Sequence, residues 1–336
     1  MKKYFFILVA ILLSLSSFAQ EKYTISGYVQ EESSGENLIG VSIYDKQTYK
    51  GTASNQYGFY SLTLPQGDYV IIYSFIGYKS ITKNITLDKN TRLNVSLTSD
   101  AIIKEEVIVT GERLDKNVSS SNMSQAKIEV NNIKQLPVIL GEVDIMKAAQ
   151  LLPGIQSGGE GNSGLYVRGG GPDQNLILLD EAVVYNAAHL FGFFSVFNAD
   201  AIKDINIIKG GMPAEYGGRL SSVLDISMKD GNNKKYELAG GIGLLSSRLT
   251  IEGPVQKDKS SFIVSGRRTY IDVLSKPFLN NDNAFSGSGY YFYDLTTKIN
   301  YKISDKDRLY LSGYFGRDVF SFNNSDNGIG IEKRFR

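Results

Sequence analysis

The chain has 336 residues, and its 36 basic and 35 acidic side chains give a formal net charge of +1. Such a balance produces no field that would hold nucleic acid or an anionic membrane surface, so both functions are disfavoured. Cysteine is absent and His189 is the single histidine, which excludes disulfides, thiolate nucleophiles and multi-histidine metal sites. The 34 glycines and 21 tyrosines are typical of a chain with many short strands and turns.

Residues 1–19 have the pattern of a secretory signal peptide. Lys2 and Lys3 form a basic head, residues 4–15 are almost wholly apolar, and small side chains precede a cleavage site before Gln20. The alternative, a membrane-spanning helix, needs about 20 apolar residues, which this run does not reach. The sequence therefore predicts an exported chain that is periplasmic, secreted or embedded in a membrane as strands.

Residues 20–100 alternate apolar and polar side chains between clusters of turn-forming residues. Strand patterns recur about every 8–12 residues, which predicts an all-β sandwich of about seven strands. The motifs resemble those of the carboxypeptidase regulatory-like domain at positions 26–29, 38–41, 51–60, 65–69 and 76–78. The resemblance implies an accessory module for docking or spacing. Because the region has no histidine, it lacks the ligands that a peptidase zinc site requires.

Residues 101–124 differ in composition from the sandwich. A β-prone run at 105–110 is followed by a polar, serine-rich tract. One interpretation is the last strand of the sandwich followed by a linker. The other is an extended segment that offers its free backbone edge to a partner strand, a role that requires only residues that favour extension.

Residues 125–230 mix short helical and strand patterns, which indicates an α+β domain. The spacing of apolar residues predicts a helix over 139–152, closed by a Pro-Gly pair. Three glycines between 159 and 164 have the spacing of a dinucleotide-binding fingerprint. That fingerprint must follow a strand and open a helix, whereas here it leads into a strand pattern at 165–167. A flexible loop is therefore the better prediction.

The order and spacing of several motifs in this domain look like the plug domain of TonB-dependent outer-membrane receptors. The motif residues are Arg168, Gly169, Gly170, Asp180, Lys209, Gly210, Tyr216 and Gly217. In that family a short β-prone TonB box precedes the plug. The resemblance assigns this role to Glu105, Glu106, Val107, Ile108, Val109 and Thr110. It also makes residues 101–124 a tether to a TonB-type energy-transducing protein.

Residues 185–197 form an aromatic stretch. It is interpreted either as plug core or packing against a barrel wall, or as an apical loop that faces ligand, because aromatic rings supply large contact areas. On the second interpretation the ligand-binding candidates are Tyr185, His189, Phe191, Phe193 and Phe194. His189 is expected to be structural or a hydrogen-bond donor. No nucleophile elbow or Ser-His-Asp spacing occurs, so we expect no enzyme, no metal and no cofactor.

Residues 231–336 have the period-two alternation of membrane strands. From 293 to 303 apolar side chains occupy odd positions and polar ones even positions, and such runs reach the length of about 10 residues that fits a transmembrane β-barrel. A soluble sandwich, the alternative, has strands of about 5–6 residues. The apolar phase reverses within 236–255, which predicts a tight hairpin near 244–247. The count becomes five strands, with a sixth starting near Ile329.

The expected fold class is therefore mainly β. It comprises a seven-stranded Greek-key sandwich (20–100), the tether (101–124), an α+β plug (125–230) and an incomplete transmembrane antiparallel β-barrel (231–336). Outer-membrane transporters with a plugged lumen have about 22 strands, so five or six cannot close around a plug. We expect the chain to be the N-terminal portion of a longer receptor.

The resemblance implies a receptor for active uptake of a nutrient, located in the outer membrane with its N-terminal domains in the periplasm. The plug would gate the barrel, and the ligand stays open among ferric siderophore, cobalamin, oligosaccharide and peptide. Besides TonB and outer-membrane lipid, a surface lipoprotein is a further candidate partner, as in the starch-utilisation subfamily. The short gap from Arg168 to Leu176 differs from the longer insertion of that subfamily. The alternative function is a soluble periplasmic or surface β-rich binding or adhesion protein.

Overall fold

The computed structural model describes residues 21–100, 124–134, 142–159, 164–189, 192–274, 289–304, 307–324 and 331–335. The chain divides into two compact units, Met1–Glu105 and Glu106–Arg336. The predicted signal peptide (1–19) and the predicted TonB box (105–110) lie outside the described residues. Within the described ranges, no helix is long and apolar enough to cross a membrane.

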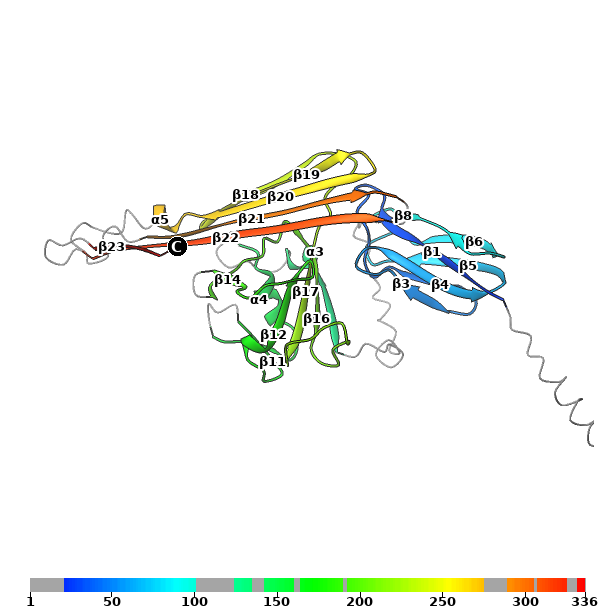
Figure 1. Ribbon diagram of the computed structural model, residues 1–336, viewed down its shortest axis with the longest axis horizontal. Helices are drawn as coiled ribbons and strands as arrows, with labels where there is room; N and C mark the ends of the chain where they lie inside the picture. Colours follow the sequence, from blue (N-terminus) through cyan, green and yellow to red (C-terminus); the bar gives the residue numbers. More distant parts are fainter. Residues whose placement is uncertain are drawn as a thin grey trace, which may run out of the picture. The chain divides into compact units, whose positions relative to one another are not determined.

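The first unit is a sandwich of two sheets, coloured blue to cyan in Figure 1. Its strands are β1 (Lys22–Glu31), β2 (Ser42–Asp45), β3 (Gly51–Ala53), β4 (Phe59–Pro65), β5 (Gly67–Ser74), β6 (Ile81–Leu87), β7 (Thr91–Arg92) and β8 (Val95–Leu97). One sheet contains β4, β1, β7 and β8, and the other has the order β3-β2-β5-β6. Alternate side chains such as Ile25, Ile43 and Ile71 are fully buried between the sheets. Each such side chain contributes about 1.5–3 kcal/mol of burial free energy.

Strands β7 and β8 behave as one interrupted strand beside β1. Both run parallel to β1 in one register, with Thr91 opposite Ile25 and Val95 opposite Val29. Between them the Leu93 backbone N–H donates to the Ser26 carbonyl at 2.8 Å. A side chain at Gly27 would place Cβ 2.0 Å from the Leu93 carbonyl oxygen, so only glycine permits this close approach. Counted this way, the sandwich has the seven strands that the sequence predicts.

The second unit contains an α+β domain, here called the plug. Its five-stranded sheet has the order β13-β12-β17-β16-β9. The sheet strands are β9 (Gln125–Glu129), β12 (Asn175–Leu179), β13 (Ala182–Val183), β16 (Ile202–Ile208) and β17 (Ser222–Met228). The other elements are α3 (Val130–Ile133), α4 (Ile145–Gln150), β10 (Ile155–Ser157), β11 (Leu165–Val167), η1 (Pro172–Gln174), β14 (Ala188–His189) and β15 (Phe194–Ser195). One apolar core, which includes Ile145, Phe197 and Leu224, joins the helices to the sheet.

Helix α4 is shorter than the helix predicted over 139–152. Its N-cap is Asp144, whose side chain accepts from the backbone N–H groups of Met146 and Lys147 at 2.8 and 3.2 Å. Val143, which the pattern placed within the helix, therefore precedes it, and residues 139–141 lie outside the described part of the chain. The predicted strand at 165–167 is confirmed as β11, which pairs with β10 in an antiparallel ladder. The glycine fingerprint thus leads into a strand, as expected.

Among the described residues after 236, the second unit has an antiparallel sheet of six strands, here called the wall. Its elements are β18 (Glu237–Ile242), β19 (Ser246–Gln256), β20 (Ser260–Thr269), α5 (Ile271–Leu274), β21 (Gly289–Lys302), β22 (Arg308–Asn324) and β23 (Ile331–Phe335). The predicted hairpin is confirmed: the turn between β18 and β19 is closed by the Gly243 N–H donating to the Ser246 carbonyl at 2.8 Å. The six strands form an open sheet, and the plug packs against one of its faces (Figure 1).

The two faces of the wall have opposite polarity. The face away from the plug exposes aliphatic side chains, among them Leu249, Leu295, Ile299 and Leu311. The face under the plug carries buried polar and charged side chains, namely Thr250, Ser265, Arg267, Asp294, Thr296 and Lys298. A one-sided sheet in water has the reverse arrangement, with the apolar face covered and the polar face solvated. Apolar-out and polar-in alternation is the pattern of strands in lipid.

Candidate functional site

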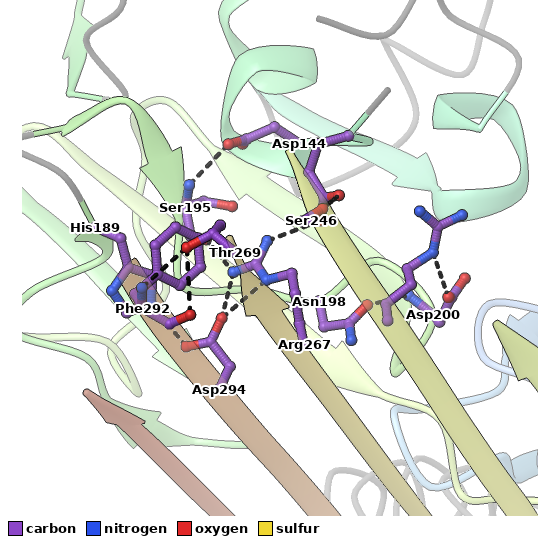
Figure 2. Close-up of polar contacts among 12 residues, drawn as sticks. Asp144, His189, Ser195, Asn198, Asp200, Ser246, Arg267, Thr269, Phe292 and Asp294 are labelled. Carbon is purple, nitrogen blue, oxygen red and sulfur yellow. Dashed lines mark hydrogen bonds and ion pairs between the residues drawn. The ribbon is translucent and has the colours of Figure 1, made fainter. Parts of the chain in front are cut away.

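The plug meets the wall through a buried charged cluster centred on Arg267 of β20 (Figure 2). The Arg267 guanidinium donates to Asp294 Oδ2 of β21 at 2.5 and 2.9 Å. It also donates to Glu142 Oε1 and to the Ser195 carbonyl of the plug, at 3.1 and 2.7 Å. One side chain of the wall therefore contacts two separate segments of the plug. Replacing one partner of such a buried pair costs about 3–5 kcal/mol, because it leaves the other charge uncompensated.

His189 of β14 lies in the same cluster. Its Nε2 is 2.7 Å from Asp294 Oδ1, and its Nδ1 is 2.8 Å from Asp318 Oδ2 of β22. The ring stacks on Phe292 with centroids 4.1 Å apart and planes 8° apart. Burial on its own lowers the pKa of His189, but the hydrogen bonds and charges of Asp294 and Asp318 outweigh it and raise the pKa above 6.5.

A second charged cluster forms around Lys298 of β21. Its ammonium is 3.0 Å from both Asp180 Oδ2 and Asp230 Oδ1. Asp180 also accepts from the Met228 backbone N–H at 2.8 Å and from the Ser312 hydroxyl. Asp180 has φ of +46°, a conformation that costs a non-glycine residue free energy. These contacts hold the turn between β12 and β13 against the wall.

A third ionic contact lies at Asp200 of the plug. Its carboxylate is 2.9 Å from Lys134 Nζ within the plug and 2.7 Å from Arg248 Nε of β19. Burial raises the pKa of Asp200, but the hydrogen bonds and charges of Lys134 and Arg248 outweigh burial, so the pKa is lowered. Nearby, Asn198 of the plug donates its side-chain N–H to Ser265 Oγ of β20 at 2.8 Å.

Apolar contact between the plug and the wall is small by comparison. One apolar cluster joins Phe194 of the plug to Tyr290 and Phe292 of β21, with Leu245 and Ile271 packed around them. The remaining buried wall residues under the plug are mostly polar or charged. Water can replace the partners of such groups when two surfaces part, whereas it cannot replace those of an apolar core. The described contacts between plug and wall are therefore mainly polar and charged.

Three of the predicted plug-motif residues meet around Ser124, which is the last residue of the tether and the first described residue after Asp100. Arg168 Nη2 donates to Ser124 Oγ at 2.9 Å, and the Lys209 backbone N–H donates to the Ser124 carbonyl at 3.0 Å. A Cβ at Gly210 would lie 2.8 Å from Arg168 Nη1, so a side chain there would require the guanidinium to shift. Lys209 Nζ also donates to the Pro153 carbonyl at 2.8 Å. These contacts fix the start of β9.

The other motif residues lie elsewhere in the plug. Asp180 belongs to the Lys298 cluster, and the Tyr216 hydroxyl donates to Asp225 at 3.1 Å, where burial raises the pKa of both groups. Gly169 has φ of +86°, and a Cβ at Gly170 would lie 2.4 Å from Ser221 Oγ. Gly217 has open space around the position of a Cβ. The plug-motif residues therefore have different contacts: some contact the end of the tether, Asp180 contacts the wall, and the others lie in turns within the plug.

The ligand candidates separate into buried and exposed residues. His189 and Phe194 are each 3% exposed and pack against the wall. Tyr185 is 87% exposed and Phe193 is 41% exposed. A ligand-binding role for these residues stays a prediction. Phe191 lies outside the described residues.

The charged partners on the wall were missed as site residues. Arg267, Asp294 and Lys298 occupy polar positions of alternating strands, so their direction was readable from the pattern. Their plug partners Glu142 and Asp200 carry no comparable local signal. Within the described residues, no group of histidine and carboxylate side chains could hold a metal ion.

Comparisons with known proteins agree with this arrangement. Residues 25–109 match the CarboxypepD_reg-like domain, and residues 118–222 match the TonB-dependent Receptor Plug Domain. The chain is 29% identical over 245 residues to TonB-dependent receptor SusC of Bacteroides thetaiotaomicron, covering 68% of this chain and 23% of SusC. It is 25% identical over 362 residues to TonB-dependent receptor P3 of Formosa agariphila, covering 98% of this chain and 34% of P3.

Among solved structures, the siderophore receptor PirA from Acinetobacter baumannii is similar with a TM-score of 0.43 and 20% identity, over 60% of this chain and 32% of PirA. The chain thus spans about a third or less of the length of these relatives.

An α+β plug against the polar face of long strands, whose other face is apolar, is the arrangement expected of a plugged outer-membrane protein. This chain carries a carboxypeptidase regulatory-like domain and a TonB-dependent receptor plug domain, and TonB-dependent receptors match it over most of its length. It is an outer-membrane protein, and the relatives named above, SusC and P3, are TonB-dependent receptors.

Proposed function

We propose that the chain serves active uptake of a nutrient across the outer membrane, with the plug as the gate and a TonB-type protein as the source of force. The observation that supports this most directly is the interface between plug and wall. Arg267, Lys298 and Arg248 of the wall each contact a carboxylate of the plug, on a face that is otherwise polar. Such an interface holds the plug in one place yet can part by rehydration.

We propose that force enters the plug at Ser124. A partner strand bound to residues 105–110 would pull on the tether that ends there. Arg168 and the Lys209 backbone hydrogen-bond to Ser124, and the pulling force would pass from Ser124 to β9. Strand β9 is the edge of the plug sheet and pairs only with β16 among the strands of that sheet. An edge strand has one ladder of hydrogen bonds to lose, so it is the part of the sheet that separates first.

A catalytic role is not part of this proposal. The single histidine has both ring nitrogens engaged by carboxylates of the wall, which leaves it unable to act as a general base.

We propose the domain boundaries 20–100, 125–230 and 231–336 for sandwich, plug and first membrane strands. The ligand is proposed from four classes, ferric siderophore, cobalamin, oligosaccharide or peptide, with Tyr185 and Phe193 as candidate contacts. A surface lipoprotein remains a proposed partner.

Uptake assays on cells expressing the gene test this function. Radiolabelled cyanocobalamin, a ferric siderophore, a fluorescent oligosaccharide and a labelled peptide would be offered in turn, with and without a protonophore. We expect one probe class to enter only in cells that carry the gene and only without the protonophore. Entry that persists with the protonophore would contradict energy coupling. Release of the protein from membranes by carbonate would instead support the soluble adhesion alternative.

A further inference from the structure

The two contacts of His189 require a particular protonation state. A neutral imidazole has one N–H and one lone pair, so it can donate to only one acceptor. Here both ring nitrogens face carboxylate oxygens, at 2.7 Å from Asp294 and 2.8 Å from Asp318. If the ring were neutral, one of these contacts would set a lone pair against a carboxylate. Only the imidazolium donates from both nitrogens.

We propose that His189 carries a proton while the plug is in contact with the wall, and that separation of the two releases this proton. The inference builds on the proposed gating function, because it concerns the same movement of the plug. His189 belongs to the plug, whereas both of its acceptors belong to the wall. Moving the plug away therefore removes both carboxylates from the ring at once.

The charges around the ring favour the same state. The titratable and charged groups are Arg267 of β20, Tyr290 and Asp294 of β21, Tyr314 and Asp318 of β22, Glu142 of the plug beyond Arg267, and Lys147 of α4 over the Phe194 ring beside it. Among the groups that hydrogen-bond to the ring or to Arg267, three carboxylates (Glu142, Asp294 and Asp318) stand against one guanidinium. A charged His189 supplies a second cation and leaves one net negative charge. A neutral His189 would leave two.

The proton does not belong on Asp294. Its Oδ2 accepts two hydrogen bonds from Arg267, and its Oδ1 accepts from the Tyr314 hydroxyl at 2.9 Å. An ionised carboxylate accepts all of these bonds, whereas a carboxylic acid would have to donate one. Asp318 likewise accepts from the Tyr290 hydroxyl on its other oxygen. Both acceptors are therefore occupied as carboxylates.

The pH dependence follows from the pKa of His189, which is raised in contact with the wall. Away from the wall the imidazole titrates near its ordinary value of about 6.5. The stabilisation of the closed plug by His189 is therefore fully present below about 6.5 and is lost as pH rises through the raised pKa. Between about 6.5 and the raised pKa, opening of the plug releases a proton and closure takes one up.

Because His189 is the single histidine, nitrogen-15 NMR of the histidine-labelled chain in detergent micelles reports this ring alone. At about pH 7.5, roughly one unit above the ordinary pKa, we expect both ring nitrogens to show the imidazolium shift. A neutral tautomer at that pH would overturn the proposal. The NMR measurement does not depend on transport. A neutral His189 would therefore contradict this proposal without contradicting uptake, and a failed uptake assay would leave the protonation of His189 untouched.

The Asp318→Asn variant tests whether the Asp318 carboxylate holds the proton on His189. Because the side chain is 43% exposed and asparagine has nearly the same shape, the substitution should leave the fold intact. We expect it to lower the pKa of His189 by about one unit, a tenfold change in the protonation equilibrium. The control is Asp173→Asn, an exposed carboxylate on η1 away from the ring. An unchanged titration in Asp318→Asn would contradict the proposed role of Asp318.

Hydrogen exchange tests the link to plug movement. Ser195 lies in β15, which pairs with β14, the strand that contains His189. Its backbone N–H donates to Asp144 Oδ2 at 2.7 Å. We expect its protection in the wild-type chain to fall between about pH 6 and pH 9 relative to the His189→Gln variant, whose glutamine does not titrate. The ratio of the wild-type exchange rate to the His189→Gln rate at each pH removes the intrinsic pH dependence of amide exchange, which is the same in both chains. A constant ratio across this range would overturn the link between the proton and the movement.

Discussion

The ammonium of Lys298 lies 3.0 Å from the carboxylate of Asp180, although the two residues belong to the wall and to the plug. Lys298 also contacts Asp230, so one cation compensates two carboxylates whose side chains are 13% and 14% exposed. This arrangement makes Lys298 a position where the stability of the closed plug can be measured.

Replacing Lys298 by Met leaves Asp180 and Asp230 without their cation. We expect the free energy that holds the plug to the wall to fall by about 3–5 kcal/mol, because two largely buried carboxylates lose the cation that they share. Calorimetric unfolding of the detergent-solubilised chain measures this loss. Lys257→Met, on the exposed turn between β19 and β20, is the matched control and should change the transition little. Equal behaviour of the two variants would show that the Lys298 cluster contributes nothing to docking.

Gly210→Ala tests the hydrogen bonds that hold Ser124 at the end of the tether. The new Cβ would meet Arg168 Nη1 at 2.8 Å, and φ of +155° is unfavourable for alanine, so Arg168 should leave Ser124. We expect ligand binding to persist while energy-dependent uptake slows several-fold. Gly217→Ala is the control, because nothing lies within 4 Å of its Cβ position. Slower uptake in both variants, or in neither, would argue against a specific role of the Ser124 contacts.

Proline in the proposed TonB box tests strand pairing directly. Val107→Pro and Ile108→Pro each remove a backbone N–H that a paired strand must donate. We expect both to abolish uptake and to prevent capture of the chain by the periplasmic domain of TonB, with ligand binding unchanged. Ser120→Pro, in the polar part of the tether, should retain uptake. Wild-type uptake in Val107→Pro and Ile108→Pro would remove the TonB-box assignment.

An arginine on the outer face of the wall tests the membrane environment. Leu295 is 43% exposed and points away from the plug. In lipid, Leu295→Arg should cost about 2–4 kcal/mol near the bilayer centre and reduce the yield in outer membranes. Ile76→Arg, at an 84% exposed position of the sandwich, should have no such effect. Full yield of Leu295→Arg would favour the soluble alternative.

Acid should weaken the plug at Asp200. Its pKa in the folded chain is lowered below the unfolded value of about 3.9. The contribution of Asp200 is therefore present above that value and is lost as pH falls through the lowered pKa. Stability measured from about pH 6 to pH 2 should decline less steeply in Asp200→Asn than in the wild type. Parallel declines would mean that Lys134 and Arg248 do not stabilise the ionised carboxylate.

The sequence predicted the wall well because its signal is local. Alternation from 293 to 303 assigned the direction of each side chain in β21, and the phase reversal near 244–247 located the hairpin that precedes β19. The sandwich was predictable for the same reason. The later start of α4 has a local signal in Asp144, a capping residue, which the apolar spacing over 139–152 does not reflect.

The contacts between plug and wall could not be predicted in this way. His189 and Asp294 are separated by 105 positions, and Arg267 and Glu142 by 125. Nothing near Glu142 in the sequence distinguishes it from a solvated carboxylate. The aromatic stretch of 185–197 indicated a contact surface but not its direction, so buried Phe194 and exposed Tyr185 could not be separated. Such contacts follow from how the plug sits on the wall.

The proposal that the plug must leave the wall is tested most directly by locking the two together. Because the chain has no cysteine, Asn198→Cys with Ser265→Cys introduces one pair across a contact that now measures 2.8 Å between side-chain atoms. Mass spectrometry of the joined peptides establishes the bridge, and the single variants are the controls. We expect the bridged receptor to bind its probe but to take up none, with uptake restored by a reductant. Wild-type uptake by the bridged receptor would contradict the proposed gating.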